Sequence, residues 1–246
     1  MMYENKIRFF NWANLILPLL AIPLGVYSPG MILISILFYY FIIVVGVDIG
    51  LHRLFCHSSF KTNRFYEYFL TLLTIPATTG SPLVWSAIHR CHHNYSDTDK
   101  DPHSPKKYSA IQLLLGLWDA KGLPLKMALP REFDTKFHKF IHKWYFTLIL
   151  LYCAFLSLFG ISAILYFYVI PSALVHIHQS FINIFSHSGP YNSDSKDYSN
   201  NIPWVVYIYP VLGYHHVHHL HPKLHRLGPV DLAATLIEKV FSREKL

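Results

Sequence analysis

The sequence predicts an all-α integral membrane protein with four transmembrane helices in two hairpins and a cytosolic helical cap that holds a histidine-rich site for two metal ions. Three observations predict this fold. The 246-residue chain is 52% hydrophobic and only 14% charged, whereas soluble domains are about 25% charged. Two long apolar regions are each interrupted by a turn signal, and histidines cluster in short segments outside these regions.

The first apolar region predicts a helical hairpin. Residues 9–28 are mostly apolar and are followed by a turn signal at Ser28-Pro29-Gly30. Residues 31–51 then consist almost entirely of Ile, Leu, Val and Phe as far as Val47. Because a hydrocarbon layer of about 30 Å needs about 20 helical residues, we expect each segment to form one span.

The second apolar region predicts another hairpin. It runs from residue 144 to residue 175 and is broken only at Phe159-Gly160. One helix of this length would exceed the bilayer, so we expect spans at 144–159 and 161–182 with a tight turn at Gly160. Backbone polar groups inside lipid must be paired within the segment, which favours helices throughout.

The basic residues indicate the orientation of the hairpins. Lys and Arg are concentrated between Arg53 and Lys143 and near both termini, whereas the two hairpin turns contain none. By the positive-inside rule, we expect the cap, residues 52–143 and 183–246, to lie in the cytoplasm with both termini. The whole chain then forms one domain. The formal net charge is +7, but the basic residues form no patch interleaved with aromatics, so no nucleic-acid partner is expected.

Histidines form three short clusters near the cytoplasmic ends of the spans. The second and third clusters share one spacing, in which two histidines follow the first after three and four residues and therefore lie on one helical face. The clusters are His52 and His57; His89, His92 and His93; and His215, His218 and His219. Neutral imidazole is a ligand for zinc, copper, iron and nickel. Since these histidines exceed the four ligands of one zinc site, we expect two metal ions. Imidazole suits redox-active iron, and a pair of irons can activate dioxygen.

The first cluster has a different spacing. His52 and His57 are five residues apart, which is about 140° around an ideal α-helix. They therefore cannot share one straight face. Either the helix ends between them, or each points toward a different metal ion.

Further polar residues are candidates for the same site. His187 follows the fourth span, and Asn183 lies one helical turn before it. Three carboxylates and one more histidine are expected to form hydrogen bonds that orient the ligating histidines; they are Asp48, Asp97, Asp101 and His103. By contrast, His138 and His142 fit a solvent-exposed helical face.

The three clusters resemble the histidine boxes of the membrane-bound fatty acid desaturase family, particularly its delta-9 acyl desaturase branch. The matching segments are His52-Arg-Leu-Phe-Cys-His57, His89-Arg-Cys-His-His93, Asn183-Ile-Phe-Ser-His187 and His215-His-Val-His-His219. The resemblance extends from about Gly46 to Pro222, and the occurrence of all boxes in this order is highly specific.

The resemblance implies a four-helix membrane domain with a cytosolic cap and a di-iron centre. It implies nine histidine ligands, namely His52, His57, His89, His92, His93, His187, His215, His218 and His219. Asn183 would act through water, and Trp85 would lie beside an acyl tunnel. The implied reaction uses dioxygen and two electrons to introduce a cis double bond into a fatty acyl chain. The electrons would come from a separate donor of the cytochrome b5 or ferredoxin type.

Several alternatives stay open at the level of sequence. The acyl carrier is coenzyme A, acyl carrier protein or a glycerolipid, and the third box, with His216, is similar to that of desaturases acting on lipid-linked chains. A hydroxylase or acetylenase on the same scaffold would have the same ligands. A histidine-rich metal transporter should instead place ligands along a path through the bilayer, where only His176 and His178 are found.

Overall fold

The computed structural model describes residues 3–208 and 212–242. Within these ranges the chain is helical, and strand-like pairing is confined to one bridge between Asn192 and Asp197. The elements are α1 (Tyr3–Ala21), η1 (Ile22–Leu24), α2 (Pro29–Phe41), η2 (Ile42–Cys56), α3 (Arg64–Ala77), α4 (Pro82–Tyr95), α5 (Ala110–Leu114), α6 (Leu125–Ala128), η3 (Arg131–Phe133), α7 (Lys136–Ser157), α8 (Ile161–Ile164), η4 (Leu165–Val169), α9 (Ile170–Phe185), η5 (Pro203–Tyr207), η6 (Leu212–Tyr214), α10 (His215–Leu220), α11 (Leu232–Leu236) and η7 (Ile237–Phe241).

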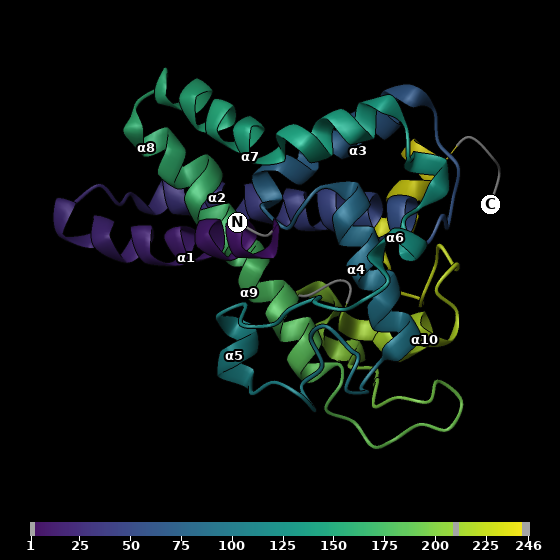
Figure 1. Cartoon of the computed structure of the whole chain (residues 1–246). Helices are drawn as coiled ribbons and strands as arrows, with labels where there is room; N and C mark the ends of the chain where they lie inside the picture. Colours follow the sequence, from purple (N-terminus) through teal and green to yellow (C-terminus); the bar gives the residue numbers. More distant parts are fainter. Residues whose placement is uncertain (1–2, 209–211, 243–246) are drawn as a thin grey trace.

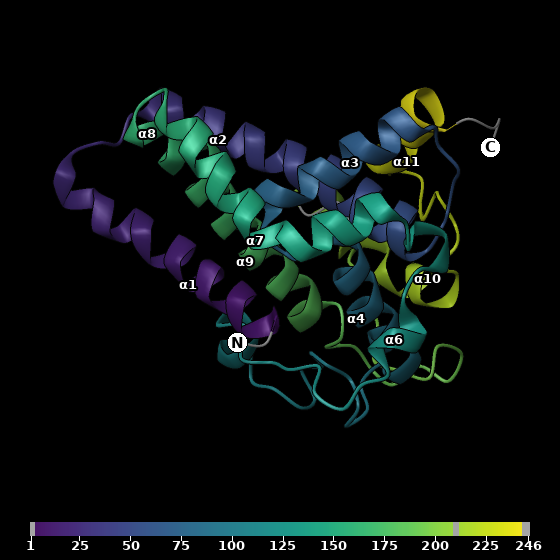
Figure 2. The same ribbon diagram turned by 45° about the horizontal axis from the view of Figure 1, so that its top comes forward.

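Four long helices are apolar enough to cross a membrane, which confirms the predicted fold class. They are Tyr3–Leu24, Pro29–Cys56, Lys136–Ser157 and Ile161–Phe185. In Figures 1 and 2 the turns that join α1 to α2 and α7 to α8 lie at one end of the molecule, while α4, α10 and α11 lie toward the other. The protein is therefore an integral membrane protein with two hairpins and a helical cap.

The helix ends differ from the predicted spans for local reasons. The first helix ends at Leu24 rather than at residue 28, because Gly25 adopts a left-handed backbone conformation with φ of 62°. Gly160, with φ of 102°, forms the predicted second turn. The third helix begins at Lys136, eight residues before the predicted span, because the Thr135 side chain accepts a hydrogen bond from the backbone N–H of His138.

The outward faces of the long helices carry large apolar side chains. Leu20 and Leu24 of the first helix are 64% and 73% exposed, and Leu150 and Leu151 of α7 are each 59% exposed. An apolar outer surface of this extent is unfavourable in water and favourable in lipid, so these faces are the ones that contact the bilayer.

The element η2 lies at the centre of the molecule, and all of its residues are buried. Close approach of α3 explains part of this burial. A Cβ atom on Gly46 would lie 3.1 Å from the carbonyl oxygen of Leu73, and one on Gly50 would lie 3.5 Å from Cβ of Leu70. Two glycines one turn apart therefore let the helices pack closely, which brings the end of η2 into the cap.

The prediction that His138 is solvent-exposed was wrong. Its side chain is fully buried between α7 and α3. Its Nε2 atom lies 3.2 Å from the hydroxyl of Thr71, and its Nδ1 atom lies 3.0 Å from the hydroxyl of Thr135. The imidazole is accommodated in the interior because both ring nitrogens have hydrogen-bond partners.

Candidate metal centre

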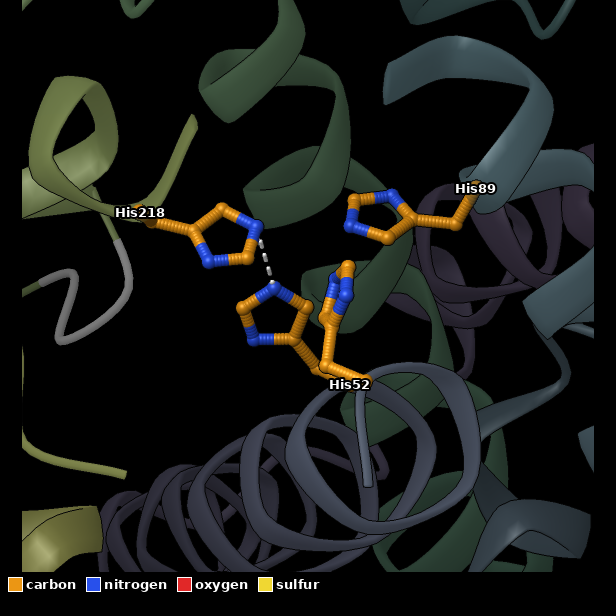
Figure 3. A group of neighbouring side chains, drawn as sticks. His52, His89 and His218 are labelled. Atoms are coloured by element: carbon orange, nitrogen blue, oxygen red, sulfur yellow. Dashed lines mark hydrogen bonds between the residues drawn. The ribbon is translucent and has the colours of Figure 1, made fainter. Parts of the chain in front are cut away.

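A first group of histidines comes from three segments that are distant in the sequence. His52 lies near the end of η2 and His57 directly follows it, whereas His89 lies on α4 and His218 on α10. One ring nitrogen of each lies within 4.8 Å of those of the others. Figure 3 shows the rings of His52, His89 and His218 pointing toward one another. Nε2 of His52 lies 2.9 Å from Nε2 of His218. This geometry can hold one metal ion.

A second group lies directly beside the first. It consists of His92, His187, His215 and His219, again with one nitrogen each within 4.8 Å. His93 lies between the groups, since its ring centroid is 4.8 Å from that of His57 and 4.4 Å from that of His219. The structure thus brings together all nine histidines that the sequence indicated as ligands.

The first cluster owes its geometry to an unusual helical winding. Of the two alternatives predicted for His52 and His57, the structure agrees with the first, because η2 ends at Cys56, and not with the second, because both rings belong to one group. In η2 the backbone closes i→i+5 hydrogen bonds, and the N–H of His57 donates to the carbonyl of His52 at 3.1 Å. This wider turn brings residues five apart onto one side, and the two rings are 5.0 Å apart. Such π-type segments are rare and are often found at functional sites.

Four carboxylates hold the histidines from outside the two groups. Each accepts a hydrogen bond from Nδ1–H of one histidine, which fixes the tautomer and directs the Nε2 lone pair toward the centre. The pairs are Asp48 with His52 at 3.2 Å, Asp101 with His92 at 2.9 Å, Asp97 with His187 at 2.8 Å and Asp197 with His219 at 2.7 Å.

The sequence indicated three of these carboxylates and missed the fourth. Asp197 lies in a polar loop 22 residues before His219, and no spacing rule links the two. Its other oxygen accepts hydrogen bonds from the hydroxyls of Ser195 and Ser199. A ring nitrogen of the predicted residue His103 lies within 4.8 Å of ligand atoms of His92 and Asp101, and its backbone N–H donates to Asp101 and so helps to place that carboxylate.

Burial keeps most of these imidazoles neutral. It lowers the pKa of His57, His89, His93, His215, His218 and His219 well below the usual value of 6.5. At His92, burial acts in the same direction, but the Asp101 carboxylate outweighs it and raises the pKa. For Asp101 itself, burial would raise the pKa, but His92 and His103 outweigh this effect and lower it. Neutral histidines can donate lone pairs to a metal ion.

The donor atoms fit a bound cation. Nε2 of His218 lies 2.9 Å from Nε2 of both His52 and His93. A neutral imidazole carries one N–H, so Nε2 of His218 cannot form a full hydrogen bond with both neighbours. Nitrogen lone pairs of these rings therefore point toward one another. The Nε2 atoms of His57 and His219 are buried without a hydrogen-bond partner. A metal ion would satisfy these atoms, and an all-nitrogen donor set suits iron, zinc or copper.

A cavity of about 110 Å³ opens from the histidines toward the membrane helices. Apolar side chains form much of its wall, including Ile43 and Val47 of the second long helix. Trp85 and Asn183 also line it, and the Trp85 indole stacks on the His89 ring with centroids 4.8 Å apart. The two residues that the sequence indicated beside the ligands therefore face the same space.

Comparisons with known proteins identify the family. A model of the family described as fatty acid desaturase matches residues 27–229. The chain belongs to this family. The region that matches the desaturases contains all nine clustered histidines and also Asp197, whereas Asp231 and the whole of α1 lie outside it.

Individual desaturases resemble the chain over most of its length. The sn-1 stearoyl-lipid 9-desaturase of Anabaena variabilis is 30% identical over 85% of this chain and 81% of its own length. The Delta-9 acyl-lipid desaturase 1 of Arabidopsis thaliana is 29% identical over 89% of this chain and 68% of its own length. A probable acyl-CoA desaturase of Schizosaccharomyces pombe is 31% identical over 92% of this chain and 50% of its own length.

Proposed function

We propose that this protein is an oxygen-dependent desaturase that introduces a cis double bond into a fatty acyl chain. The observation that carries the proposal is the pair of adjoining histidine groups open to one apolar cavity, in a chain of the fatty acid desaturase family. We further propose that the metal ions are two irons and that the nine clustered histidines are their ligands.

Each class of residue has a defined task in this proposal. The neutral imidazoles supply lone pairs, and the four carboxylates hold those rings in one tautomer. Bound iron would supply the chemistry that reduces dioxygen, and each of two adjacent methylenes would lose one hydrogen. The apolar wall that includes Ile43 and Val47 would hold the chain and exclude water, while Trp85 would fix the methylenes beside His89. Asn183 would position a water at the cavity wall.

A lipid-linked acyl chain is the substrate that the comparisons favour. The relatives from Anabaena variabilis and Arabidopsis thaliana are named for acyl-lipid substrates, and the chain covers more than two thirds of each. The relative from Schizosaccharomyces pombe is named for an acyl-CoA substrate. In vitro assays with phosphatidylcholine, acyl-CoA and acyl carrier protein substrates would separate the three carriers.

The orientation and the electron donor also belong to the proposal. The basic residues concentrated between Arg53 and Lys143 support a cytoplasmic cap by the positive-inside rule. Two electrons per double bond would come from a separate donor of the cytochrome b5 or ferredoxin type. Charge complementarity with an acidic donor would speed its association with the basic cap.

Expression in a host with a compatible reductase, followed by lipid profiling, tests the proposal. A new monounsaturated chain is expected with the wild-type protein and not with His218→Ala, which removes a nitrogen from the first group. An added hydroxyl group would point instead to a hydroxylase, and a triple bond to an acetylenase. No modified chain from an iron-loaded protein with an active donor would contradict the proposal.

A further inference from the structure

Arg53 is buried beside the candidate metal centre, and its guanidinium bridges two carboxylates from opposite ends of the chain. The side chain of Arg53 is 3% exposed. Its Nε atom lies 3.0 Å from Oδ1 of Asp48, and its Nη1 atom lies 3.1 Å from Oδ2 of Asp231. An unpaired buried charge is strongly destabilising. Both carboxylates therefore compensate the buried positive charge of Arg53.

The first of these carboxylates also holds a candidate ligand. Oδ1 of Asp48 is 3.0 Å from Nε of Arg53 and 3.2 Å from Nδ1 of His52. Nη2 of Arg53 lies 3.4 Å from the other oxygen. Two contacts from one planar guanidinium fix the plane of a carboxylate. Arg53 thereby determines the direction from which Asp48 receives the His52 hydrogen bond.

The second carboxylate belongs to the C-terminal segment. Oδ1 of Asp231 caps α11 by accepting from the backbone N–H of Ala234 at 2.9 Å, and Oδ2 accepts from the N–H of Leu227 at 3.0 Å. Arg53 also donates to the carbonyl oxygen of His225. The segment from 225 to 234 is therefore attached to the end of η2 through one side chain.

We infer that Arg53 and Asp231 are positioning residues for His52, through which the C-terminal segment sets the orientation of one metal-ligating imidazole. The inference rests on the proposed metal centre and extends it to Arg53, a non-histidine residue of the first box, and to Asp231, which lies outside every box. Asp231 lies beyond the region matched by the family model. The relay runs from Asp231 to Arg53, then to Asp48, and ends at His52.

The effect should be confined to the first histidine group. The other three carboxylates are held without an arginine by backbone N–H groups or serine hydroxyls: Asp97 by Ser104 and Tyr198, Asp101 by Asp97 and His103, and Asp197 by Ser195 and Ser199. Loss of Arg53 should thus weaken one metal site and spare its neighbour.

Co²⁺ titration of the metal-free, full-length protein tests the inference by visible absorption, without any need for turnover. The wild-type protein should bind Co²⁺ in two steps, and His218→Ala assigns the step that belongs to the first group. Arg53→Gln should weaken that step by about 10- to 100-fold, the usual cost of removing an outer partner, and leave the other step unchanged. Asp231→Asn should act in the same direction with a smaller effect.

Arg226→Gln is the matched control. Arg226 lies in the same C-terminal segment and pairs with Glu238 at 2.8 Å on the surface. Its substitution should leave both Co²⁺ steps unchanged.

A double-mutant cycle separates positioning from general stability. In Asp48→Asn the relay is already broken, so adding Arg53→Gln should not weaken the first step further. The double variant removes both charges of the pair, which keeps the test valid if Arg53→Gln alone does not fold. Additive losses, equal weakening of both steps, or an unchanged first step in Arg53→Gln would overturn the inference. Two Co²⁺ steps in a protein without desaturase activity would contradict only the proposed function.

Discussion

Oδ2 of Asp197 accepts a hydrogen bond from Nδ1 of His219 at 2.7 Å, the shortest of the four carboxylate–histidine contacts around the candidate metal centre. Both side chains are nearly inaccessible to solvent. Because Nδ1–H of His219 donates to this carboxylate, its Nε2 lone pair faces the second histidine group. Asp197 therefore has the same relation to its histidine as the carboxylates that the sequence did indicate.

Substitution Asp197→Asn should weaken metal binding at the second group by about 10- to 100-fold. The amide is nearly isosteric, but it carries no charge and can present an N–H to the imidazole instead of an acceptor. Metal competition with a chromophoric chelator measures the change. Asp194→Asn, an exposed carboxylate in the same loop, should have no effect. Equal metal affinity in the two variants would contradict the role given to Asp197.

Trp85 should control where the acyl chain is modified. Its indole lines the cavity and stacks on His89 with an interplanar angle of 22°. Trp85→Ala would leave space in which the chain can shift, so the double-bond positions should broaden and KM should rise roughly tenfold, equivalent to about 1.4 kcal/mol. Trp85→Phe should keep one main product. Mass spectrometry of product double bonds measures both, and an unchanged product from Trp85→Ala would refute this role.

Asn183 should affect turnover more than metal binding. Its amide lines the cavity that also contains His52, His89 and His215, one helical turn before His187. Asn183→Leu preserves the approximate volume and removes the polar group, so kcat should fall about tenfold or more while iron content is retained. Parallel measurement of kcat and bound iron decides the matter. Loss of iron together with activity would show a role in metal binding instead.

The metal-free protein should lose stability below about pH 6.5. Unfolded histidines titrate near pH 6.5, whereas burial lowers the pKa of His103 in the folded protein to about 3 and that of six ligating histidines well below 6.5. The unfolded chain then binds more protons in this window, so the free energy of unfolding falls as the pH falls.

His92 acts in the opposite direction. Its pKa is raised, so its contribution is present below pH 6.5 and is lost as the pH rises through its folded value. One such group does not offset seven with lowered pKa. Thermal unfolding of apo-protein at pH 7.5, 6.5 and 5.5 should give successively lower Tm values. In a separate sample of metal-loaded protein, the metal should be released over the same pH range. A Tm that is constant or rises on acidification would contradict the neutral state of these imidazoles.

Much of the fold followed from the sequence because its signals are local. Long apolar runs predicted four membrane helices, and Gly160 marked the second turn. The spacing of His89, His92 and His93 placed three rings on one helical face, and the lengths of the second and fourth spans placed His52 and His187 just beyond the membrane. Asp97 and Asp101 were recognised because they lie close in sequence to the second cluster.

The remaining features depend on contacts that local patterns do not encode. The i→i+5 winding that joins His52 to His57 arises where η2 packs against α3, and an apolar run carries no sign of it. Asp197 reaches His219 only because its loop folds back over α10. His138 lies on the polar face of a helical pattern, yet the docking of α3 buries it.

The number of irons bound per chain tests the central claim most directly. Protein reconstituted with Fe²⁺ under anaerobic conditions and freed of excess metal should contain two irons per chain. His218→Ala and His187→Ala, which each disable one group, should each retain about one iron, and the double variant should retain none. A wild-type protein with one iron or fewer, or a double variant that keeps two, would contradict a di-iron centre built from these histidines.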